Sequence, residues 1–168
     1  MHAPTVTPHL AAYSAANNDK PPRHLGVRYN LNAEFLHEPG NTVVCHLAEG
    51  SRTQCAVVRT RQKLLDLPEA RAHLAFTPVS SLHMTVFQGI IEYRRDWPYW
   101  PKDMPSDTPI AGMTDFYLEK LQRFPDLPPF AMQVIRVTPI GLTLKGATAE
   151  DDRTVAHWRN AFADLFGY

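Results

Sequence analysis

Two short segments of the chain alternate hydrophobic and polar residues in the way that is typical of β-strands. They are residues 42–47 (TVVCHL), which follow the turn signal EPGN, and residues 82–91 (LHMTVFQGII), which follow a proline and two serines. Successive side chains of a strand point to opposite faces, so every second residue of each segment shares a face. The pattern therefore predicts two strands, each with one face that suits a hydrophobic core.

Three other segments repeat their hydrophobic residues at helical spacing. They cover residues 51–66, 107–124 and 148–167, and a shorter helix is predicted within residues 69–76 (EARAHLAF). The residues that would mark the helix ends are Ser51 or Thr53 and Asp66 for the first, Asp107 with Pro109 in the first turn for the second, and a Thr148–Asp151 capping box and Gly167 for the third. Each long helix is expected to lay a hydrophobic stripe on the core.

Residues 130–146 (FAMQVIRVTPIGLTLKG) predict two antiparallel strands that join near residues 139–141, and residues 26–30 predict a short strand or an extended segment. The order of strand, helix, strand, helix, strand pair and helix is typical of an α+β fold with antiparallel sheets. A helix on a sheet usually leads back to a strand, and this sequence ends at residues 167–168. We therefore expect that the C-terminal part of the fold is missing.

The chain divides into residues 1–25, a loose leader rich in proline, asparagine and small residues, and residues 26–168, one incomplete domain. No run approaches the ~18 apolar residues of a membrane span, and the N-terminus lacks the pattern of a signal peptide. Cys45 and Cys55 show neither a CxxC spacing nor a disulfide framework, so reduced thiols are expected. These features predict a cytoplasmic protein that does not contact a membrane.

Charge and motifs narrow the range of partners. The chain carries 17 Lys and Arg residues against 17 Asp and Glu residues, and its pI is near 7.1. Binding along a nucleic acid needs a surplus of Lys and Arg, so an extended nucleic-acid surface is not expected, whereas a small anionic ligand remains compatible. The sequence has no glycine-rich phosphate loop, and HEPG at residues 37–40 lacks the second histidine of a zinc-protease helix. Neither a cofactor nor a metal is therefore expected.

A long loop is predicted at residues 93–109 (YRRDWPYWPKDMPSDTP), which combines prolines with aromatic residues. Loops of this length are uncommon in compact domains and are often functional. Tyr93, Tyr99 and Trp100 could stack on a nucleobase, because aromatic faces bind bases with little sequence preference. The alternative is a hydrophobic plug that the prolines hold in place.

The predicted strand at residues 82–91 carries two residues that suit phosphate chemistry. His83 and Thr85 share one face of it, and Met84 and Val86 share the hydrophobic face. An imidazole takes and gives protons near neutral pH, and a hydroxyl can donate a hydrogen bond to a phosphate oxygen. On this short motif alone, a histidine with a purely structural role is the more frequent case.

Thr42, Val44 and His46 share a face of the other predicted strand. Thr42 and His46 are thus further candidates for substrate binding, since this face could line the same cleft as His83. Two alternatives stand beside this interpretation. His46 could be bonded within the sheet, and Thr42 could build the turn into the strand.

Three stretches of the chain together resemble a known family: PGNTVVCHL at residues 39–47, SSLHMTVFQG at residues 80–89 and YWP at residues 99–101. The second stretch resembles the H-x-T/S signature of the two-histidine (2H) phosphoesterase superfamily. All three together resemble a bacterial subfamily of uncharacterised 2H-like proteins. The resemblance runs from about residue 26 to residue 166.

The resemblance implies a fold of two similar α+β lobes that flank a cleft, each lobe supplying one H-x-T/S strand. In the family one histidine acts as general base and the other as general acid, while the Thr or Ser hydroxyls hold the phosphate. The implied substrates are small phosphodiesters, such as nucleotides or RNA ends with a 2′,3′-cyclic phosphate, and no metal is required. His83 and Thr85 match the motif, so they are the implied catalytic residues of a cyclic phosphodiesterase, a hydrolase.

A second H-x-T/S motif is not found in this sequence. The other histidines, none of which has Thr or Ser two positions later, are His2, His9, His24, His37, His46, His73 and His157. The resemblance would place the second motif on a strand after the last helix, where this sequence stops. We therefore expect a fragment or a natural truncation with weak or absent turnover.

Three functions remain open from the sequence. They are a 2H-type phosphoesterase, a non-catalytic relative that binds a nucleotide or another ligand, and a protein-interaction module that uses the aromatic loop. A large exposed hydrophobic patch at Trp97, Tyr99 and Trp100 would favour the interaction module. A strand missing from a sheet would leave an unpaired edge, which is compatible with a homo-oligomer.

Overall fold

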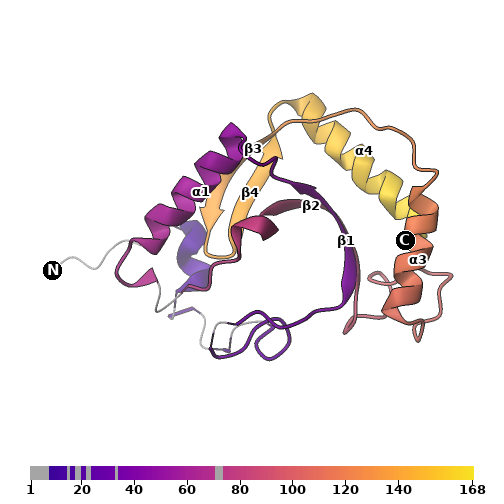
Figure 1. Cartoon of the computed structure of the whole chain (residues 1–168), viewed down its shortest axis with the longest axis horizontal. Coiled ribbons are helices and arrows are strands. Elements are labelled where there is room, and N and C mark those ends of the chain that lie inside the picture. The colour runs from indigo at the N-terminus through magenta and orange to yellow at the C-terminus, as the bar shows by residue number, and fades with distance from the viewer. Residues whose placement is uncertain (1–7, 15, 18–19, 22–23, 33, 71–73) are drawn as a thin grey trace.

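The structure is a computed structural model that describes residues 8–14, 16, 17, 20, 21, 24–32, 34–70 and 74–168 (Figure 1). Its longer elements are β1 (Gly40–His46), α1 (Arg52–Leu65), β2 (His83–Ile91), α3 (Ile110–Leu121), β3 (Met132–Thr138), β4 (Gly141–Gly146) and α4 (Ala149–Phe166). Two 3₁₀ helices, η1 (Pro8–Tyr13) and η2 (Val79–Ser81), complete the order. The predicted order of the main elements and the predicted α+β class are confirmed.

Local sequence accounts for where two of the helices begin and end. The Ser51 hydroxyl accepts a hydrogen bond from the Gln54 backbone N–H at 3.1 Å and so caps α1. Thr148 and Asp151 form the predicted capping box of α4. Gly167 ends α4 with a φ of 82°, a left-handed conformation that glycine adopts without a Cβ clash.

Three local predictions are wrong. The N-cap of α3 is Pro109 rather than Asp107, because proline adopts the extended backbone that precedes this helix, with a ψ of 145°. The same helix ends at Leu121 instead of reaching residue 124. Residues 26–30 form turns with isolated bridges of Tyr29 to Leu25 and Phe35, rather than a strand.

Two further predictions concern segments that the structure describes only in part. The short helix predicted within residues 69–76 falls largely on residues 71–73, which lie outside the described residues. The leader at residues 1–25 includes η1, so it is not irregular throughout. Its residues 1–7, 15, 18, 19, 22 and 23 also lie outside the described part.

β1 and β2 form an antiparallel ribbon that contains a β-bulge. Its paired residues include His46 with His83, Cys45 with Met84, Val44 with Thr85, Val43 with Phe87, and Thr42 with Gln88. Val86 is therefore an extra residue on β2. A bulge lets two consecutive side chains turn to one side, and Val86 and Phe87 both pack in the hydrophobic core.

β3 and β4 form a second antiparallel ribbon, joined near Pro139 as predicted. Large hydrophobic side chains remain exposed along it: Val134, Ile135, Val137, Ile140 and Leu142. The base of the ribbon is fixed to the start of α4. The Ala131 N–H donates to the Asp151 carboxylate at 2.8 Å, and the Gly146 N–H donates to the Asp152 carboxylate at 2.7 Å.

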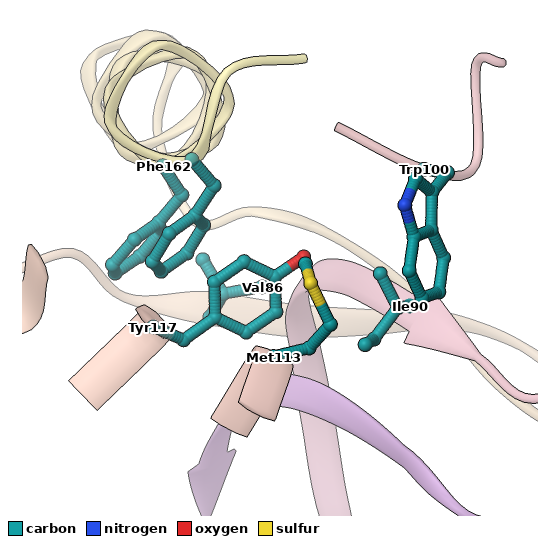
Figure 2. Close-up of a cluster of buried hydrophobic side chains, with 7 residues drawn as sticks. Val86, Ile90, Trp100, Met113, Tyr117 and Phe162 are labelled. Atoms are coloured by element: carbon teal, nitrogen blue, oxygen red, sulfur yellow. The ribbon is translucent and has the colours of Figure 1, made fainter. Parts of the chain in front are cut away.

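The hydrophobic core joins β2, α3, α4 and the loop that precedes α3 (Figure 2). Its buried side chains are Val86, Ile90, Trp100, Met113, Tyr117, Phe162 and Phe166. The Phe87 ring of β2 packs against α4, with ring centroids 6.2 Å from Phe162 and 5.7 Å from Phe166. The core therefore holds β2 from one side.

Two other sequence predictions concern the cysteines and the lack of a membrane-spanning segment. Cys45 and Cys55 are both free thiols. Burial raises the pKa of Cys45, which favours the uncharged thiol. Among the described residues, no helix combines the length and the hydropathy that crossing a bilayer requires.

Candidate active site

His83 and Thr85 lie next to each other on the exposed face of β2. The strand begins at His83, and its alternation places Thr85 on the same face. Both residues are exposed, whereas Met84 and Val86 pack on the opposite side. An imidazole and a hydroxyl are thus open to a ligand on an extended segment, in the arrangement that the sequence predicted.

A backbone contact orients the His83 ring and selects its tautomer. The Nδ1 atom lies 2.6 Å from the carbonyl oxygen of Ser81, in the η2 turn directly before the strand. A carbonyl only accepts hydrogen bonds, so Nδ1 carries the proton in this contact. In the neutral ring Nε2 is then the unprotonated nitrogen, which is the atom that can take a proton from a reacting group.

His46 lies directly across the ribbon from His83. The two ring centroids are 6.3 Å apart, and the ring planes are inclined by 67°. Residues that are directly opposite in an antiparallel pair project to the same face. His46 is exposed as well, so the structure brings this weaker candidate into the immediate neighbourhood of His83 and Thr85.

Thr42 lies on the same face, opposite Gln88, and both side chains are exposed. Gln88 follows Thr85 by three residues and would face the other way in a regular strand. The bulge at Val86 restores it to this face. Regular alternation does not predict Gln88 on this face, although the consecutive hydrophobic residues Val86 and Phe87 break the alternation and could have indicated the bulge. We call the six residues Thr42, Val44, His46, His83, Thr85 and Gln88 the His83 face.

α4 supports the bulge from the opposite side of the ribbon. The Arg159 Nε–H donates to the backbone carbonyl of Val86 at 3.1 Å. A bulge disrupts the regular ladder of backbone hydrogen bonds, and a side chain from a neighbouring helix can supply a partner there. The strand that carries His83 and Thr85 is therefore fixed both by ring packing and by this hydrogen bond.

A cavity of about 150 Å³ lies at the other end of the ribbon, where β1 and β2 meet α3. Thr42, Gly89, Tyr117 and Leu121 are among the residues that line it. His83 and the residues beside it at the opposite end of the ribbon do not line it. Burial, together with a hydrogen bond to the Tyr168 hydroxyl, raises the pKa of Tyr117, so its hydroxyl stays neutral. Thr42 is thus shared between the cavity and the His83 face.

Tyr93 lies apart from the His83 face. It follows the far end of β2, on the order of 30 Å from His83 along an extended chain. Its hydroxyl accepts a hydrogen bond from the Arg28 Nε–H at 3.1 Å and lies 3.4 Å from Nδ1 of His24. The structure does not bring this predicted substrate contact together with His83.

The prediction that Trp100 contacts a substrate is corrected by its burial. The side chain is 3% exposed within the hydrophobic core. Its Nε1–H donates to the carbonyls of Met104 and Pro105 at 3.1 and 3.2 Å, and the Arg95 guanidinium lies 4.9 Å from the ring centroid. With no open face for a base, the ring acts as the hydrophobic plug that was the alternative.

The exposed aromatic patch that would favour an interaction module is smaller than the sequence suggested, because Trp100 is buried. Trp97 and Tyr99 are exposed, but Trp100 is not. The Lys102 ammonium lies 4.3 Å from the Trp97 ring centroid, and the Arg94 guanidinium lies 4.2 Å from the Tyr99 centroid. The exposed rings are therefore capped by cations rather than joined into one hydrophobic surface.

Three of the other histidines that the structure describes, His24, His37 and His157, do not join this face. His37 and His157 are exposed on other elements, and His24 contacts Tyr93. His2 and His73 lie outside the described residues. Within the part of the chain that the structure describes, no three His, Cys, Asp or Glu side chains are grouped so that they could hold a metal ion.

Comparison with known proteins gives a family and a related structure. The family model 2H-phosphodiest, described as "Domain of unknown function (DUF1868)", matches residues 28–143. The chain is also 61% identical to a crystal structure of a conserved protein of unknown function, ATU0111, from Agrobacterium tumefaciens str. C58. That similarity has a TM-score of 0.93 and covers 97% of this chain and 70% of that chain. No curated protein matches this chain.

Proposed function

The chain belongs to the 2H-phosphodiest family of unknown function, and from this premise we propose that it opens the phosphodiester of a nucleotide or of an RNA end with a 2′,3′-cyclic phosphate. The observation that carries the proposal is the exposed pair of His83 and Thr85 with Nε2 of the imidazole free to take a proton. Fold membership alone does not assign an activity, whereas these two side chains supply groups that can take a proton and bind a phosphate.

In the proposed reaction, Nε2 of His83 removes a proton from the attacking water. The water oxygen forms a bond to phosphorus as one ester oxygen leaves. The contact between Nδ1–H and the Ser81 carbonyl holds the ring in the tautomer that this step needs, and the same carbonyl stabilises the imidazolium that results.

Thr85 holds the phosphate in this proposal. Its hydroxyl projects from the same face as the imidazole and can donate a hydrogen bond to a non-bridging phosphate oxygen. The strength of such a contact depends on placing the hydroxyl to within a fraction of an ångström. A strand that packs on a core provides the rigid support that this placement needs. Neither role requires a metal.

The test is hydrolysis of 2′,3′-cyclic nucleotides by the wild-type chain and by three variants. His83→Ala should lower kcat/KM by about 10²–10⁴-fold, the usual contribution of a general acid or base. Thr85→Val, which keeps the shape but removes the hydroxyl, should lower it by about 10-fold. His157→Gln, an exposed histidine on α4, is the matched control and should behave as wild type.

Full activity in His83→Ala would remove this residue from the mechanism. Loss of activity on adding EDTA would contradict the proposal that no metal takes part. A binding role without turnover is the second candidate, and it is favoured by the single H-x-T/S motif in the sequence. If a cyclic nucleotide protects His83 from chemical modification but no product forms, the binding role is supported instead.

A further inference from the structure

The cavity between the ribbon and α3 runs from buried residues to exposed ones. Tyr117 and Phe166 are buried, and so is Gly89, where an added Cβ atom would lie only 3.3 Å from the Tyr117 ring. The lining residues Thr42 and Leu118 are exposed, and Thr42 also belongs to the His83 face. A molecule bound on the His83 face can therefore extend past Thr42 into the cavity.

One polar atom in the wall of this cavity has an unmet hydrogen bond. The Nδ2 atom of Asn41 is buried, and none of the described residues accepts a hydrogen bond from it. The Oδ1 atom of the same amide accepts from the Thr114 hydroxyl at 3.1 Å, and the Tyr117 hydroxyl is bonded to that of Tyr168 at 2.7 Å. A buried donor without a partner destabilises a fold, so its place beside a cavity indicates that a ligand supplies the acceptor.

The size and the lining of the cavity suit a single six-membered ring. Its volume is about 150 Å³, and a cavity of this volume holds a molecule as large as benzene. The aromatic side chains of Phe87 and Tyr117 are part of its lining, and such side chains bind the rings of bases. Uracil and cytosine are single rings with a carbonyl at C2 that accepts a hydrogen bond, whereas a purine has two fused rings.

The spacing along β1 matches the dimensions of a nucleotide. Val44, the cross-strand partner of Thr85, follows Thr42 by two residues. Two residues of a strand span about 7 Å. In a 2′,3′-cyclic nucleotide the ribose separates the base from the cyclic phosphate by a similar distance. A phosphate held at Thr85 therefore leaves its base close to the cavity.

We propose that this cavity binds the base of the substrate and selects pyrimidine over purine nucleotides, an inference that rests on the proposed function. The pyrimidine ring occupies the cavity, and its C2 carbonyl accepts a hydrogen bond from Asn41 Nδ2. The ribose passes Thr42, and the cyclic phosphate lies at His83 and Thr85. The volume of the cavity excludes the second ring of a purine.

The test measures binding and turnover separately. Calorimetry gives the Kd of uridine 3′-monophosphate and of adenosine 3′-monophosphate, and kcat/KM is measured on 2′,3′-cyclic UMP and 2′,3′-cyclic AMP. The wild-type chain should prefer the uridine compound by at least about 10-fold in both measurements.

Two variants probe the wall and the mouth of the cavity. Asn41→Leu removes the unpaired donor at a similar side-chain volume, and the Thr114 hydroxyl keeps its hydrogen bond to the Ile110 carbonyl at 2.9 Å. Leu118→Trp narrows the mouth from an exposed position. Leu67→Trp is the matched control, because Leu67 is an exposed leucine that does not line the cavity.

Asn41→Leu should weaken the binding of uridine 3′-monophosphate by about 10-fold without lowering the melting temperature, because the variant removes a buried donor that has no partner. A lower melting temperature with an unchanged preference for uridine would show that Asn41 has only a structural role, and would overturn its contact with the base. Leu118→Trp should also weaken uridine binding, whereas Leu67→Trp should behave as wild type.

Equal affinity and equal turnover for the two bases would overturn the base site while leaving the proposed chemistry at His83 intact. Selective binding of the uridine compound with no turnover of either cyclic nucleotide would overturn the proposed function and leave the cavity as a site for a pyrimidine. Neither binding nor turnover of any of these compounds would overturn both.

Discussion

The two ribbons of the chain have the same topology but different surroundings. β1–β2 packs one face on the core through Val86 and Phe87 and exposes the other. β3–β4 is tied to α4 at its base and exposes hydrophobic side chains over the rest of its length, up to Ile140, which is 83% exposed. In Figure 1 the strands of the first ribbon curve through the centre of the molecule.

This difference shows which ribbon can carry a site. A two-stranded ribbon alone is marginally stable in water and needs a packed face to become rigid. The exposed polar residues that could take part in a reaction are His46, His83 and Thr85. All three lie on the ribbon that has such support. The other ribbon exposes the large hydrophobic side chains Val134, Ile135, Val137, Ile140 and Leu142, which suit contact with other polypeptide rather than chemistry.

The largest expected effect comes from removing the support of the first ribbon. Phe162 is 3% exposed and contacts the rings of Phe87, Phe124 and Phe166, so Phe162→Ala should lower the free energy of unfolding by about 3–5 kcal/mol. Ile140→Ala on the second ribbon should change it by less than about 0.5 kcal/mol. Urea unfolding measures both. Similar losses would contradict the contrast between the ribbons.

A smaller effect is expected at Gly89, where the backbone of β1 lies close to the backbone of β2. A Cβ atom added to Gly89 would lie 2.5 Å from the backbone oxygen of Asn41, so Gly89→Ala must push the strands apart and should cost about 1–3 kcal/mol. Gly112→Ala in α3 is the matched control, since its nearest neighbour, the Thr108 methyl, is at 3.6 Å. The control should be neutral or stabilising by up to about 1 kcal/mol, because alanine favours helices.

The hydrogen bond from α4 to the bulge should contribute less again. Arg159→Met keeps the aliphatic stem but removes the donor to the Val86 carbonyl, and about 1 kcal/mol of stability should be lost. Arg153→Met, which removes an exposed ion pair with Glu150, should cost less than about 0.5 kcal/mol. If Arg159 positions the strand, its variant should also lower kcat on cyclic nucleotides, whereas the Arg153 variant should not.

The smallest effect concerns the base of the second ribbon and appears in acid. Hydrogen bonds from Thr148, and then from the Ala131 N–H, hold the pKa of Asp151 below its usual value of 3.8. A lowered folded-state pKa contributes stability above the unfolded pKa, and this contribution is lost as the pH falls below about 4 toward the folded value. Asp151→Asn should therefore show a weaker fall in melting temperature between pH 6 and pH 3 than wild type. Asp107→Asn, an exposed aspartate that caps no helix, should keep the wild-type slope.

The sequence predicted the elements whose signals are local. The alternation of residues 82–91, the capping box at Thr148 and the glycine at position 167 each act within a few residues, and each was confirmed. The same holds for the shared face of His83 and Thr85, which depends only on strand alternation. Asp107 was misjudged because proline at 109 already supplies the extended backbone before α3.

The rest depends on contacts between segments that are distant in sequence. Pairing His46 with His83 requires the register of two strands separated by a helix, and no local signal fixes that register. Trp100 could be judged only from the core that forms around it, because an aromatic residue in a loop serves equally well as a binding surface or as a plug. Tyr93 is set apart from His83 by the length of β2, which its own neighbours do not reveal.

The extra residue at position 86 also limits how this segment can evolve. With the residue present, Val86 and Phe87 both turn inward, and the alternation shifts by one residue so that Gln88 faces outward like His83 and Thr85. Deleting a single residue between Thr85 and Gln88 would restore a regular ladder in which His83, Thr85 and Gln88 stay outside, but only one of the two hydrophobic side chains would remain to fill the core. Relatives that fill the core in the same way must therefore keep two consecutive hydrophobic residues between Thr85 and Gln88, even where the residue types change.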